Sequence, residues 1–480
     1  MAGVLVTHGY FYRLDPKQWA DARPYPPMGT LLAAAVLRQA GHTVNVFDTG
    51  LLPGPEPLQA AIEKHRPEVV VFFDDGFNYL TKMCLTVMRE AMFRMIGIAK
   101  GSGCRVVVNS SDATDHAEVY LRAGADVVLL GEGEPGLLDV IDRWRNDGTP
   151  GDVPGIAFLE NGNVQNTAKR PVMRDLDALP LPAWDLIDLE PYRRIWREAH
   201  GRFSLNLATT RGCPFKCNWC AKPIYGNRYN SRSPEHVVRE LEALLVHRPD
   251  HIWFADDIFG LKPGWVQRFR DLLQEKGLRI PYKIQSRVDL LLEADTIDAL
   301  VASGLEEVWV GAESGSQRIL DAMDKGTTVE QIAEATRLLR SKGVRVGFFL
   351  QFGYLGETEA DVHDTIAMVE ELMPDDIGVS ISYPLPGTLF YEKVKADLVD
   401  KSNWTDSDDL AMMFQNRQRP AYYKRLHRYV HKRYRRKQGL EALRNAIKGQ
   451  HFAAQRILST LYYVPVTWME QVRISRLAKT

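Results

Sequence analysis

The sequence predicts an α/β protein in consecutive parts: a doubly wound N-terminal domain (1–150), a hairpin and linker (151–199), a partial barrel of six strand–helix units (200–395) and a basic helical C-terminal region (396–480). Two observations predict this fold class. Continuous Val- and Leu-rich runs alternate with amphipathic segments, and the alternation is interrupted once, by the proline-rich LPLPAW at 179–184. Because such runs are typical of strands buried on both faces, we expect parallel sheets covered by helices.

The N-terminal domain contains the first alternating series. Strands are expected at 4–9, 43–50, 68–76, 104–111 and 125–134. Helices are expected at 26–42, 57–67, 81–101 and around 116–125. A doubly wound sheet binds its ligand beyond the carboxyl ends of its strands. Cys84 is expected inside the third helix and Cys104 at a strand start, both as buried structural thiols.

A second alternating series follows a predicted hairpin, which spans 155–168 and turns at Asn161-Gly162. Its strands are expected at 204–210, 251–257, 282–287, 307–314, 344–354 and 376–384. Helices are expected between them, for example at 233–247 and 328–343. Six units are too few for a complete eight-stranded barrel, so we expect a partial barrel with its active site at the carboxyl ends of the strands.

Composition excludes several classes of protein. A chain of 480 residues with 45% hydrophobic and 25% charged residues is typical of a multidomain soluble protein. The longest late apolar run, 461–469, is far shorter than the roughly 20 residues of a membrane-spanning helix. The N-terminus has no basic leader, and five cysteines do not suggest a disulfide framework. We therefore expect a cytoplasmic protein without a transmembrane segment.

Charge is distributed unevenly along the chain. Residues 416–480 contain 16 Lys and Arg but 2 Asp and Glu, although the net charge of the whole chain is −1. The stretch KRLHRYVHKRYRRK (424–437) interleaves these charges with aromatic residues. The favoured interpretation is a solvated basic helix that docks on the acidic body. Contact with an anionic substrate, a nucleic acid or a membrane surface is the alternative; of these, a nucleic-acid partner is not expected.

Three cysteines lie close together in LATTRGCPFKCNWCAKPIYG (207–226). Cys213, Cys217 and Cys220 have the spacing C-x3-C-x2-C and follow a predicted strand. Thiolates in such a loop bind iron or zinc, but a structural zinc site has four ligands in paired spacings, and no second pair is present. An iron–sulfur cluster held by three cysteines leaves one iron open to bind a further ligand.

This motif, with Trp219 before the last cysteine, resembles the radical S-adenosylmethionine (SAM) superfamily, and the resemblance implies that Trp219 contacts SAM. The resemblance spans about 200–395 and implies a [4Fe-4S] cluster on the three cysteines. The open iron would bind the amino and carboxylate groups of SAM. An electron from the cluster would then cleave SAM and yield a 5′-deoxyadenosyl radical, while the protein supplies orientation and excludes water.

The resemblance also implies SAM-binding residues at the ends of the second and third strands of the barrel series. Asp256 and Asp257, in FADD, would accept hydrogen bonds from the substrate ammonium. Capping of the next turn is the alternative for one of them. Ser286 and Arg287, in QSR, would contact the ribose hydroxyls and the carboxylate.

Two later strands would complete the SAM site. Glu313, in GAESGSQR, would contact the ribose or the sulfonium. The alternative for Glu313 is to cap the helix that begins at Ser316. Gln351 and Gly353, in FFLQFGYLGET, would contact the adenine.

The N-terminal domain together with the barrel is similar to the cobalamin-binding radical SAM enzymes. This resemblance implies a Rossmann-like cobalamin domain whose contacts fall at Thr7, His8, Gly9, Asn109, Ser110, Gly131, Glu132 and Gly133. The motif D-x-H-x-x-G is absent, so a strand-end role is expected for His8 rather than cobalt ligation. Asn109 and Ser110 replace a glycine pair that is common in these proteins. Asp74 and Asp75 would put two acidic groups beside the phosphate-bearing tail of the cofactor.

Three functions follow from these observations. The first is a radical SAM methyltransferase that uses a [4Fe-4S] cluster, SAM and cobalamin to methylate an unactivated centre of a small-molecule substrate. The second is a radical SAM oxidative cyclase or rearrangement enzyme without methyl transfer, of the anaerobic magnesium-protoporphyrin ester type. The third is a non-catalytic zinc- or cobalamin-binding module. Either enzyme would need an external one-electron donor such as flavodoxin or ferredoxin.

Overall fold

The computed structural model describes residues 3–146, 148–222, 224–401, 403–448 and 454–478. The chain divides into two compact units. The first unit consists of 1–214, 222–284 and 403–409, and the second of 215–221, 285–402 and 410–480. Neither unit coincides with one predicted domain, and the predicted domain limits remain predictions.

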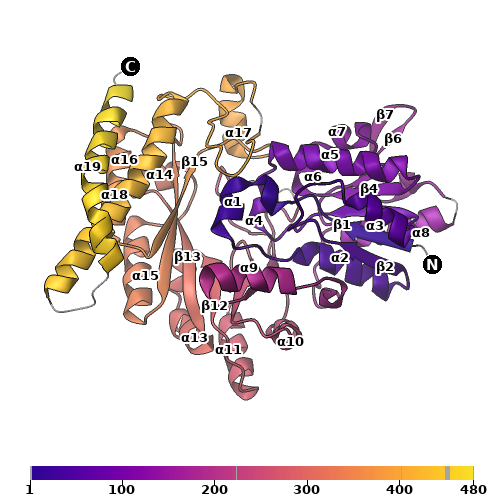
Figure 1. The fold of residues 1–480 in the computed structure, drawn as a ribbon, viewed down its shortest axis with the longest axis horizontal. Helices are drawn as coiled ribbons and strands as arrows, with labels where there is room; N and C mark the ends of the chain where they lie inside the picture. The colour runs from indigo at the N-terminus through magenta and orange to yellow at the C-terminus, as the bar shows by residue number, and fades with distance from the viewer. Residues whose placement is uncertain (1–2, 147, 223, 402, 449–453, 479–480) are drawn as a thin grey trace. The chain divides into compact units, whose positions relative to one another are not determined.

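The first unit contains a seven-stranded sheet in the order β2-β1-β3-β4-β5-β6-β7 (Figure 1). Its parallel strands are β1 (Gly3–Thr7), β2 (Thr43–Phe47), β3 (Val69–Phe73), β4 (Arg105–Asn109) and β5 (Val127–Leu129). The order reverses between β1 and β3, which confirms the doubly wound topology. The crevice at such a reversal is where a ligand binds in this class of sheet.

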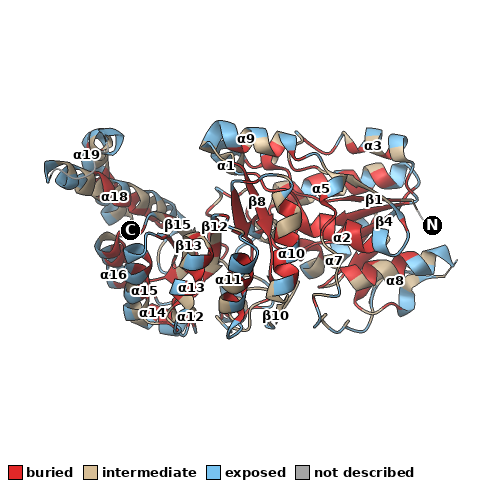
Figure 2. Ribbon diagram, turned by 90° about the horizontal axis from the view of Figure 1, so that it is seen from below, coloured by how far each residue is buried: buried red, intermediate tan, exposed pale blue. Residues whose placement is uncertain are grey.

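Helices cover both faces of this sheet. On one face α2 (Met28–Gln39) packs against α8 (Glu134–Arg145), and on the other α3 (Leu58–His65) packs against α5 (Thr86–Gly101). Further helices of this unit include α1 (Pro16–Asp21), α4 (Tyr79–Lys82), α6 (Ser111–Asp115), α7 (Ala117–Arg122) and α9 (Glu190–His200). The central strands β1, β3, β4 and β5 are almost wholly buried, as Figure 2 shows in red for β1 and β4, because helices cover them on both sides, whereas β2 at the edge is partly exposed.

The helix predicted over 81–101 is wrong at its N-terminal end. The chain forms α4, leaves the helical path at Met83–Leu85 and resumes as α5. Cys84 has a φ of +54°, in the left-handed region that no α-helix contains. The backbone N–H of Thr86 donates instead to the carbonyl of Trp404, 2.9 Å away. Cys84 is therefore not inside a helix, whereas Cys104 is buried at the start of β4 as predicted.

The predicted hairpin is confirmed at the edge of this sheet. β6 (Ile156–Glu160) and β7 (Asn163–Asn166) pair antiparallel. Asn161 and Gly162 both have positive φ, +50° and +80°. Two left-handed residues form the turn whose twist matches that of a hairpin.

All six strands predicted for the second series are present. In the first unit the order is β8 (Ser204–Leu207), β11 (His251–Phe254) and β12 (Tyr282–Ser286), with β12 ending in the second unit. The helices α10 (Pro234–Leu245) and α11 (Trp265–Glu275) follow β8 and β11. In the second unit β13 (Leu305–Glu313), β14 (Arg345–Phe352) and β15 (Asp376–Ile381) are adjacent and parallel. Helices accompany them: α12 (Val288–Leu291), α13 (Thr296–Ser303), α14 (Gln317–Ala322), α15 (Val329–Ser341), α16 (Glu359–Leu372) and α17 (Leu389–Val394).

The C-terminal region is helical, as predicted, and forms a hairpin of α18 (Pro420–Ile447) and α19 (Ala454–Leu477). Basic residues of α18 dock on acidic residues of the second unit. Arg433 makes two hydrogen bonds to the Glu370 carboxylate, and Arg435 lies 3.7 Å from Asp376. In the part of the chain that the structure describes, no helix is both long and apolar enough to cross a membrane.

Candidate functional site

The loop that carries the three cysteines begins with a close backbone contact. After β8, the short strand β9 (Thr210–Arg211) pairs antiparallel with β10 (Asn230–Ser231). Gly212 follows with a φ of +77°, and a Cβ added there would lie 2.3 Å from the carbonyl oxygen of Arg228. Only glycine fits this conformation and this distance. The contact fixes the chain immediately before Cys213.

Cys217 and Cys220 belong to one turn, in which the N–H of Cys220 donates to the carbonyl of Cys217 at 3.2 Å. All three cysteines are partly exposed, and none forms a disulfide. In the described ranges no group of three His, Cys, Asp or Glu side chains is arranged to hold a metal ion. Three reduced thiols within eight positions are nevertheless the type of ligand that holds an iron–sulfur cluster.

Asn218 anchors the cysteine turn within the second unit and was not predicted. Its side-chain amide donates to the Ala322 carbonyl and to Asp324, both at 2.8 Å, and accepts from the Tyr354 hydroxyl at 2.7 Å. Its backbone binds Met323 and Phe390. A buried asparagine with every polar group satisfied holds its neighbours in place. The sequence signal for this role was the position of an asparagine between Cys217 and Cys220.

Trp219, the predicted aromatic neighbour of SAM, lies in the same turn. Its indole N–H is buried and has no hydrogen-bond acceptor among the described residues. A buried donor without an acceptor is costly in an otherwise satisfied interior. This donor is available to a ligand.

Glu313 forms a buried ion pair at the end of β13. Lys325 donates to its carboxylate at 2.8 Å, and the two side chains are 6% and 8% exposed. Glu313 has a φ of +56° beside a bulge in β13. Gly311 makes room for the pair, since a Cβ there would lie 2.5 Å from the Lys325 ammonium. The alternative role of Glu313 as the cap at Ser316 is not supported, because its carboxylate pairs with Lys325 instead.

The charge of Lys325 is stabilised by its neighbours. Burial alone would lower the pKa of Lys325, but attraction to Glu313 and to the Cys217 thiol raises it above its ordinary value. Lys325 therefore keeps its positive charge despite its burial. The side chains of Lys325 and Glu313 hold each other in place, because moving either one away would leave the other as an unpaired buried charge.

Arg287 is fully engaged within the second unit. Its guanidinium donates to the carbonyl of Lys325 at 2.8 Å, pairs with Asp289, and lies 3.7 Å from the centre of the Phe215 ring. Ser286, beside it at the end of β12, is also buried. Arg287 thus connects three segments around the cysteine turn.

The end of β14 carries Gln351 and Gly353, which were predicted to contact SAM. Glu357, which follows them, was not predicted. The side chain of Gln351 donates to Ser382 at 2.9 Å, while its carbonyl oxygen is buried without a donor in the described part of the chain. Gly353 has a φ of +79°, and its N–H donates to Glu357 at 2.6 Å. Burial raises the pKa of Glu357 to about 8, although the Gly353 N–H opposes this. Glu357 is therefore largely protonated at neutral pH.

Asp256 and Asp257, in the first unit, both have partners. Asp256 accepts four hydrogen bonds, from the backbone N–H and hydroxyl groups of Thr209 and Thr210. Burial raises its pKa to about 6 against these bonds. Asp256 thus caps the turn after β8, which precedes it in the chain. Asp257 pairs with Lys82 at 2.6 Å.

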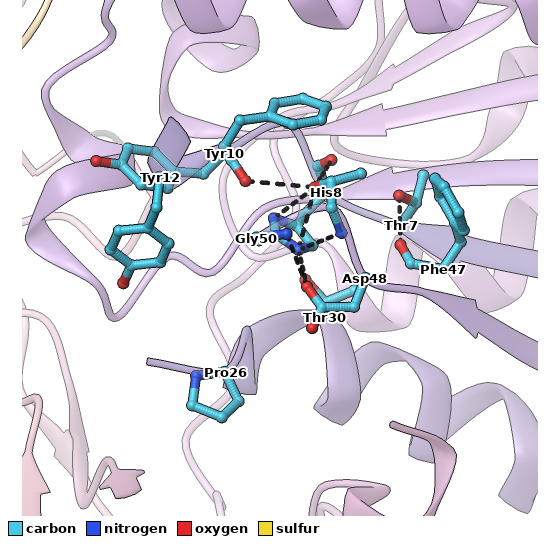
Figure 3. A network of polar contacts seen from close by, with 12 residues as sticks. Thr7, His8, Tyr10, Tyr12, Pro26, Thr30, Phe47, Asp48 and Gly50 are labelled. Carbon is cyan, nitrogen blue, oxygen red and sulfur yellow. Dashed lines mark hydrogen bonds and ion pairs between the residues drawn. The ribbon is translucent and has the colours of Figure 1, made fainter. Parts of the chain in front are cut away.

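His8 lies in a buried polar network at the end of β1 (Figure 3). Its Nε2 is 2.9 Å from Asp48, and the other Asp48 oxygen accepts from Tyr192 at 2.7 Å. Burial alone would raise the pKa of Asp48, but its bonds to His8, Gly50 and Tyr192 lower it overall. Thr7 donates to the Phe47 carbonyl. These contacts support the predicted strand-end role of His8.

Two aspartates follow β3 at the reversal of strand order. Asp74 accepts from the Gly9 N–H at 2.7 Å, and burial raises its pKa to about 6. Asp75 accepts from Gly29 and Phe77, and burial raises its pKa as well. Burial thus makes both groups easier to protonate than an exposed aspartate, which lessens the repulsion that they would exert on an anionic ligand.

The predicted cobalamin residues Asn109, Ser110, Glu132 and Gly133 line one pocket of ≈ 350 Å³ in the first unit. Asp74 lines it as well. The pocket lies at the carboxyl ends of the strands, where a doubly wound sheet binds its ligand. Thr7 and His8 lie outside it.

Polar contacts shape this pocket. The Asn109 amide donates to the carbonyls of Leu129 and Gly131, and Ser110 caps α6. Arg211 pairs with Glu132 and Glu134, both buried. Arg211 thereby offsets part of the acidic charge of the lining, and the polar groups of the pocket suit a polar ligand end such as a nucleotide tail.

Comparison with known proteins identifies the domain. Residues 207–369 match the sequence profile of the Radical SAM superfamily. The match begins in β8 and includes the cysteine loop, Glu313 and Gln351. The chain therefore carries a radical SAM domain and is a radical SAM enzyme.

Two curated relatives have different named activities. The chain is 29% identical over 392 residues to an uncharacterized methyltransferase of Pyrococcus horikoshii, covering 79% of this chain and 81% of that protein. It is also 29% identical over 391 residues to the anaerobic magnesium-protoporphyrin IX monomethyl ester cyclase of Cereibacter sphaeroides, covering 78% and 61%.

Solved structures share the fold. The methyltransferase TsrM from Kitasatospora setae, solved with cobalamin and a [4Fe-4S] cluster, matches with a TM-score of 0.67 and 18% identity, over 82% of this chain and 78% of that one. The cobalamin-dependent radical SAM enzyme OxsB matches with a TM-score of 0.72 and 15% identity, over 99% and 80%. Both matches support the mixed α/β fold with parallel sheets.

Proposed function

We propose that this protein is a cobalamin-dependent radical SAM methyltransferase that acts on a small-molecule substrate. The observation that carries the proposal is the C-x3-C-x2-C loop after β8, inside the matched radical SAM domain. The pocket at the strand ends of the N-terminal sheet adds a place for a second cofactor.

Cys213, Cys217 and Cys220 would hold the [4Fe-4S] cluster. When bound, the cluster and SAM supply a carbon radical, and cobalamin supplies a transferable methyl group. The protein's own part is to hold the thiols: Gly212 fixes the chain before Cys213, and Asn218 fixes the turn between the other two. Flavodoxin or ferredoxin is the expected class of electron donor.

SAM would lie against residues at the strand ends. Gln351 and Trp219 each offer a buried polar atom without a protein partner, which suits hydrogen bonding to adenosine. Glu313, fixed by Lys325, would accept from ribose hydroxyls, with Ser286 beside Arg287 and with Gly353 backing the adenine. Asp256 would act through the turn after β8 that it stabilises, and Asp257 through its ion pair with Lys82, because the oxygens of both groups already accept hydrogen bonds.

Cobalamin would use the pocket lined by Asn109, Ser110, Glu132 and Gly133. Gly9 and Gly131 flank this region, at Asp74 and at the Asn109 amide. Thr7 and His8 would hold the carboxyl end of β1 in place through their contacts with Phe47 and Asp48. None of these roles requires His8 as a cobalt ligand.

The second candidate is a radical SAM oxidative cyclase, and the identity with the Cereibacter sphaeroides cyclase favours it. The two functions differ in their products. A methyltransferase releases both 5′-deoxyadenosine and S-adenosylhomocysteine, whereas a cyclase releases 5′-deoxyadenosine without S-adenosylhomocysteine.

The test uses full-length protein reconstituted without oxygen with iron, sulfide and hydroxocobalamin. Dithionite and SAM are added, and both SAM products are quantified with and without cobalamin. Cobalamin-dependent S-adenosylhomocysteine is expected; its absence alongside 5′-deoxyadenosine would select the cyclase. Cys217→Ala is expected to lose the cluster and SAM cleavage, whereas Cys84→Ala, outside the loop, retains both. A Cys217→Ala protein with a full cluster and normal cleavage would refute the proposal.

A further inference from the structure

The outer face of α19 carries an exposed apolar stripe. Leu461, Tyr462 and Trp468 are 76%, 59% and 66% exposed. Leu458 and Met469, at 66% and 41%, extend the stripe along the same face, because residues 3, 4, 7, 10 and 11 positions apart share one side of a helix. Figure 2 shows α19 mostly in the colour of exposed residues.

The opposite face of α19 packs against α18. Gly439 allows this close crossing, since a Cβ there would lie 1.9 Å from the Thr460 hydroxyl. Glu470 is buried between the helices and pairs with Arg425 and Lys432 at 3.0 and 2.8 Å. These contacts fix the rotation of α19. The stripe therefore points away from the hairpin core.

The stripe is accompanied by positive charge. Residues 416–480 contain 16 basic and 2 acidic residues, and one of those acids, Glu470, is neutralised by its partners. Arg473 and Arg476 are exposed at the end of the stripe, and Arg444 and Lys448 are exposed at the end of α18. Further exposed apolar residues, Leu440, Leu443 and Ile447, lie among these charges.

This combination decides between possible occupants. A second copy of the hairpin would bring two strongly positive surfaces together, which like-charge repulsion opposes. An anionic lipid surface complements the charge and accepts the apolar side chains. Tryptophan and tyrosine favour the boundary between lipid headgroups and acyl chains, where one part of the ring is wet and the other apolar.

We propose that the α18–α19 hairpin binds the surface of an anionic lipid bilayer. The stripe of α19 lies in the headgroup boundary, parallel to the bilayer plane. The surrounding Arg and Lys side chains contact lipid phosphates. Because the helix lies on the bilayer, this mode of binding agrees with the finding that no described helix is able to cross a membrane.

The test measures flotation of the full-length protein with vesicles. Vesicles of phosphatidylcholine alone are compared with equimolar phosphatidylcholine and phosphatidylglycerol, at low and high salt. The protein is expected to float with the anionic vesicles and to be released by salt. Failure to float with anionic vesicles at low salt, or equal binding to both compositions, would overturn the proposal.

Matched variants separate the stripe from general charge. Leu461→Glu and Trp468→Glu each place a charge on the exposed stripe and are expected to weaken vesicle binding at least tenfold. Gln274→Glu adds the same charge to an exposed position on α11, outside the hairpin, and should bind within twofold of the parent. Equal loss in all three variants would overturn the proposal.

A second readout covers self-association. Light scattering gives the mass of the parent and of Leu461→Glu in solution. Unchanged mass with lost vesicle binding is expected. If Leu461→Glu instead dissociates a dimer and leaves vesicle binding intact, the stripe is an interface between copies of the chain and the proposal fails.

Discussion

Lys325 donates a 2.8 Å hydrogen bond to Glu313 in a place where both side chains are almost completely buried. The bond joins the end of β13 to the segment after α14, and Lys325 is coupled electrostatically to Cys217 as well. One ion pair therefore fixes the strand end that the resemblance assigns to SAM and neutralises charge beside the cysteine turn.

Lys325→Met is expected to destabilise the protein by about 3–5 kcal/mol, because it leaves the Glu313 carboxylate buried and unpaired. The double variant Lys325→Met/Glu313→Gln should recover much of this loss, since it removes both charges. Urea unfolding of the parent, both single variants and the double variant measures the coupling. Additive effects of the two substitutions would contradict the pairing.

Asn218→Ala removes three side-chain hydrogen bonds, each worth ~1 kcal/mol. The turn that contains Cys217 and Cys220 should loosen. We expect less iron and sulfide per protein after anaerobic reconstitution, with a weaker visible absorbance. Asn227→Ala, in which an exposed contact to Lys222 is lost, is the matched control and should reconstitute normally. Equal cluster content in both variants would show that Asn218 does not hold the turn.

Gly212→Ala is expected to be more damaging than Gly226→Ala. Both glycines have positive φ, +77° and +68°, so alanine is strained at each by about 1 kcal/mol. At Gly212 the new Cβ also meets the Arg228 carbonyl at 2.3 Å, whereas nothing lies within 4 Å at Gly226. The difference in denaturation midpoint and in cluster content isolates the close contact. Indistinguishable variants would rule it out.

Glu357 predicts a pH dependence of stability. Its pKa is about 8 in the folded protein and 4.5 as the ordinary value, so between these pH values the folded state binds the extra proton. Its contribution to stability is therefore complete below pH 4.5 and is lost as pH rises toward 8, with a slope of at most ~1.4 kcal/mol per pH unit.

Glu357→Gln keeps an oxygen for the Gly353 N–H but cannot ionise. Its unfolding free energy should vary less than that of the parent across this pH window, as measured by urea unfolding at several pH values. Glu359→Gln, a change of the same type at a group without this burial, serves as the control. Parallel pH profiles for the parent and Glu357→Gln would contradict the raised pKa.

The local sequence pattern was sufficient to predict where the strands lie. Runs such as VVVFF in β3 are buried on both faces, and a run of that kind has few alternatives to a parallel strand. The Asn161-Gly162 turn was equally predictable, because both residues accept positive φ. The break at Cys84 was not predictable, since it depends on Trp404, more than three hundred residues away in the chain.

The sequence alone determined the type of chemistry, because the spacing of Cys213, Cys217 and Cys220 is a local property of the chain. Tertiary structure alone decided which distant partners the polar residues have: Asp256 caps Thr209 and Thr210, Arg287 binds the Lys325 carbonyl, and Asn218 anchors the cysteine turn. The physical reason is that a buried polar atom must be satisfied by whatever folding brings within about 3 Å. Sequence distance does not limit that choice, so only the folded chain reveals it.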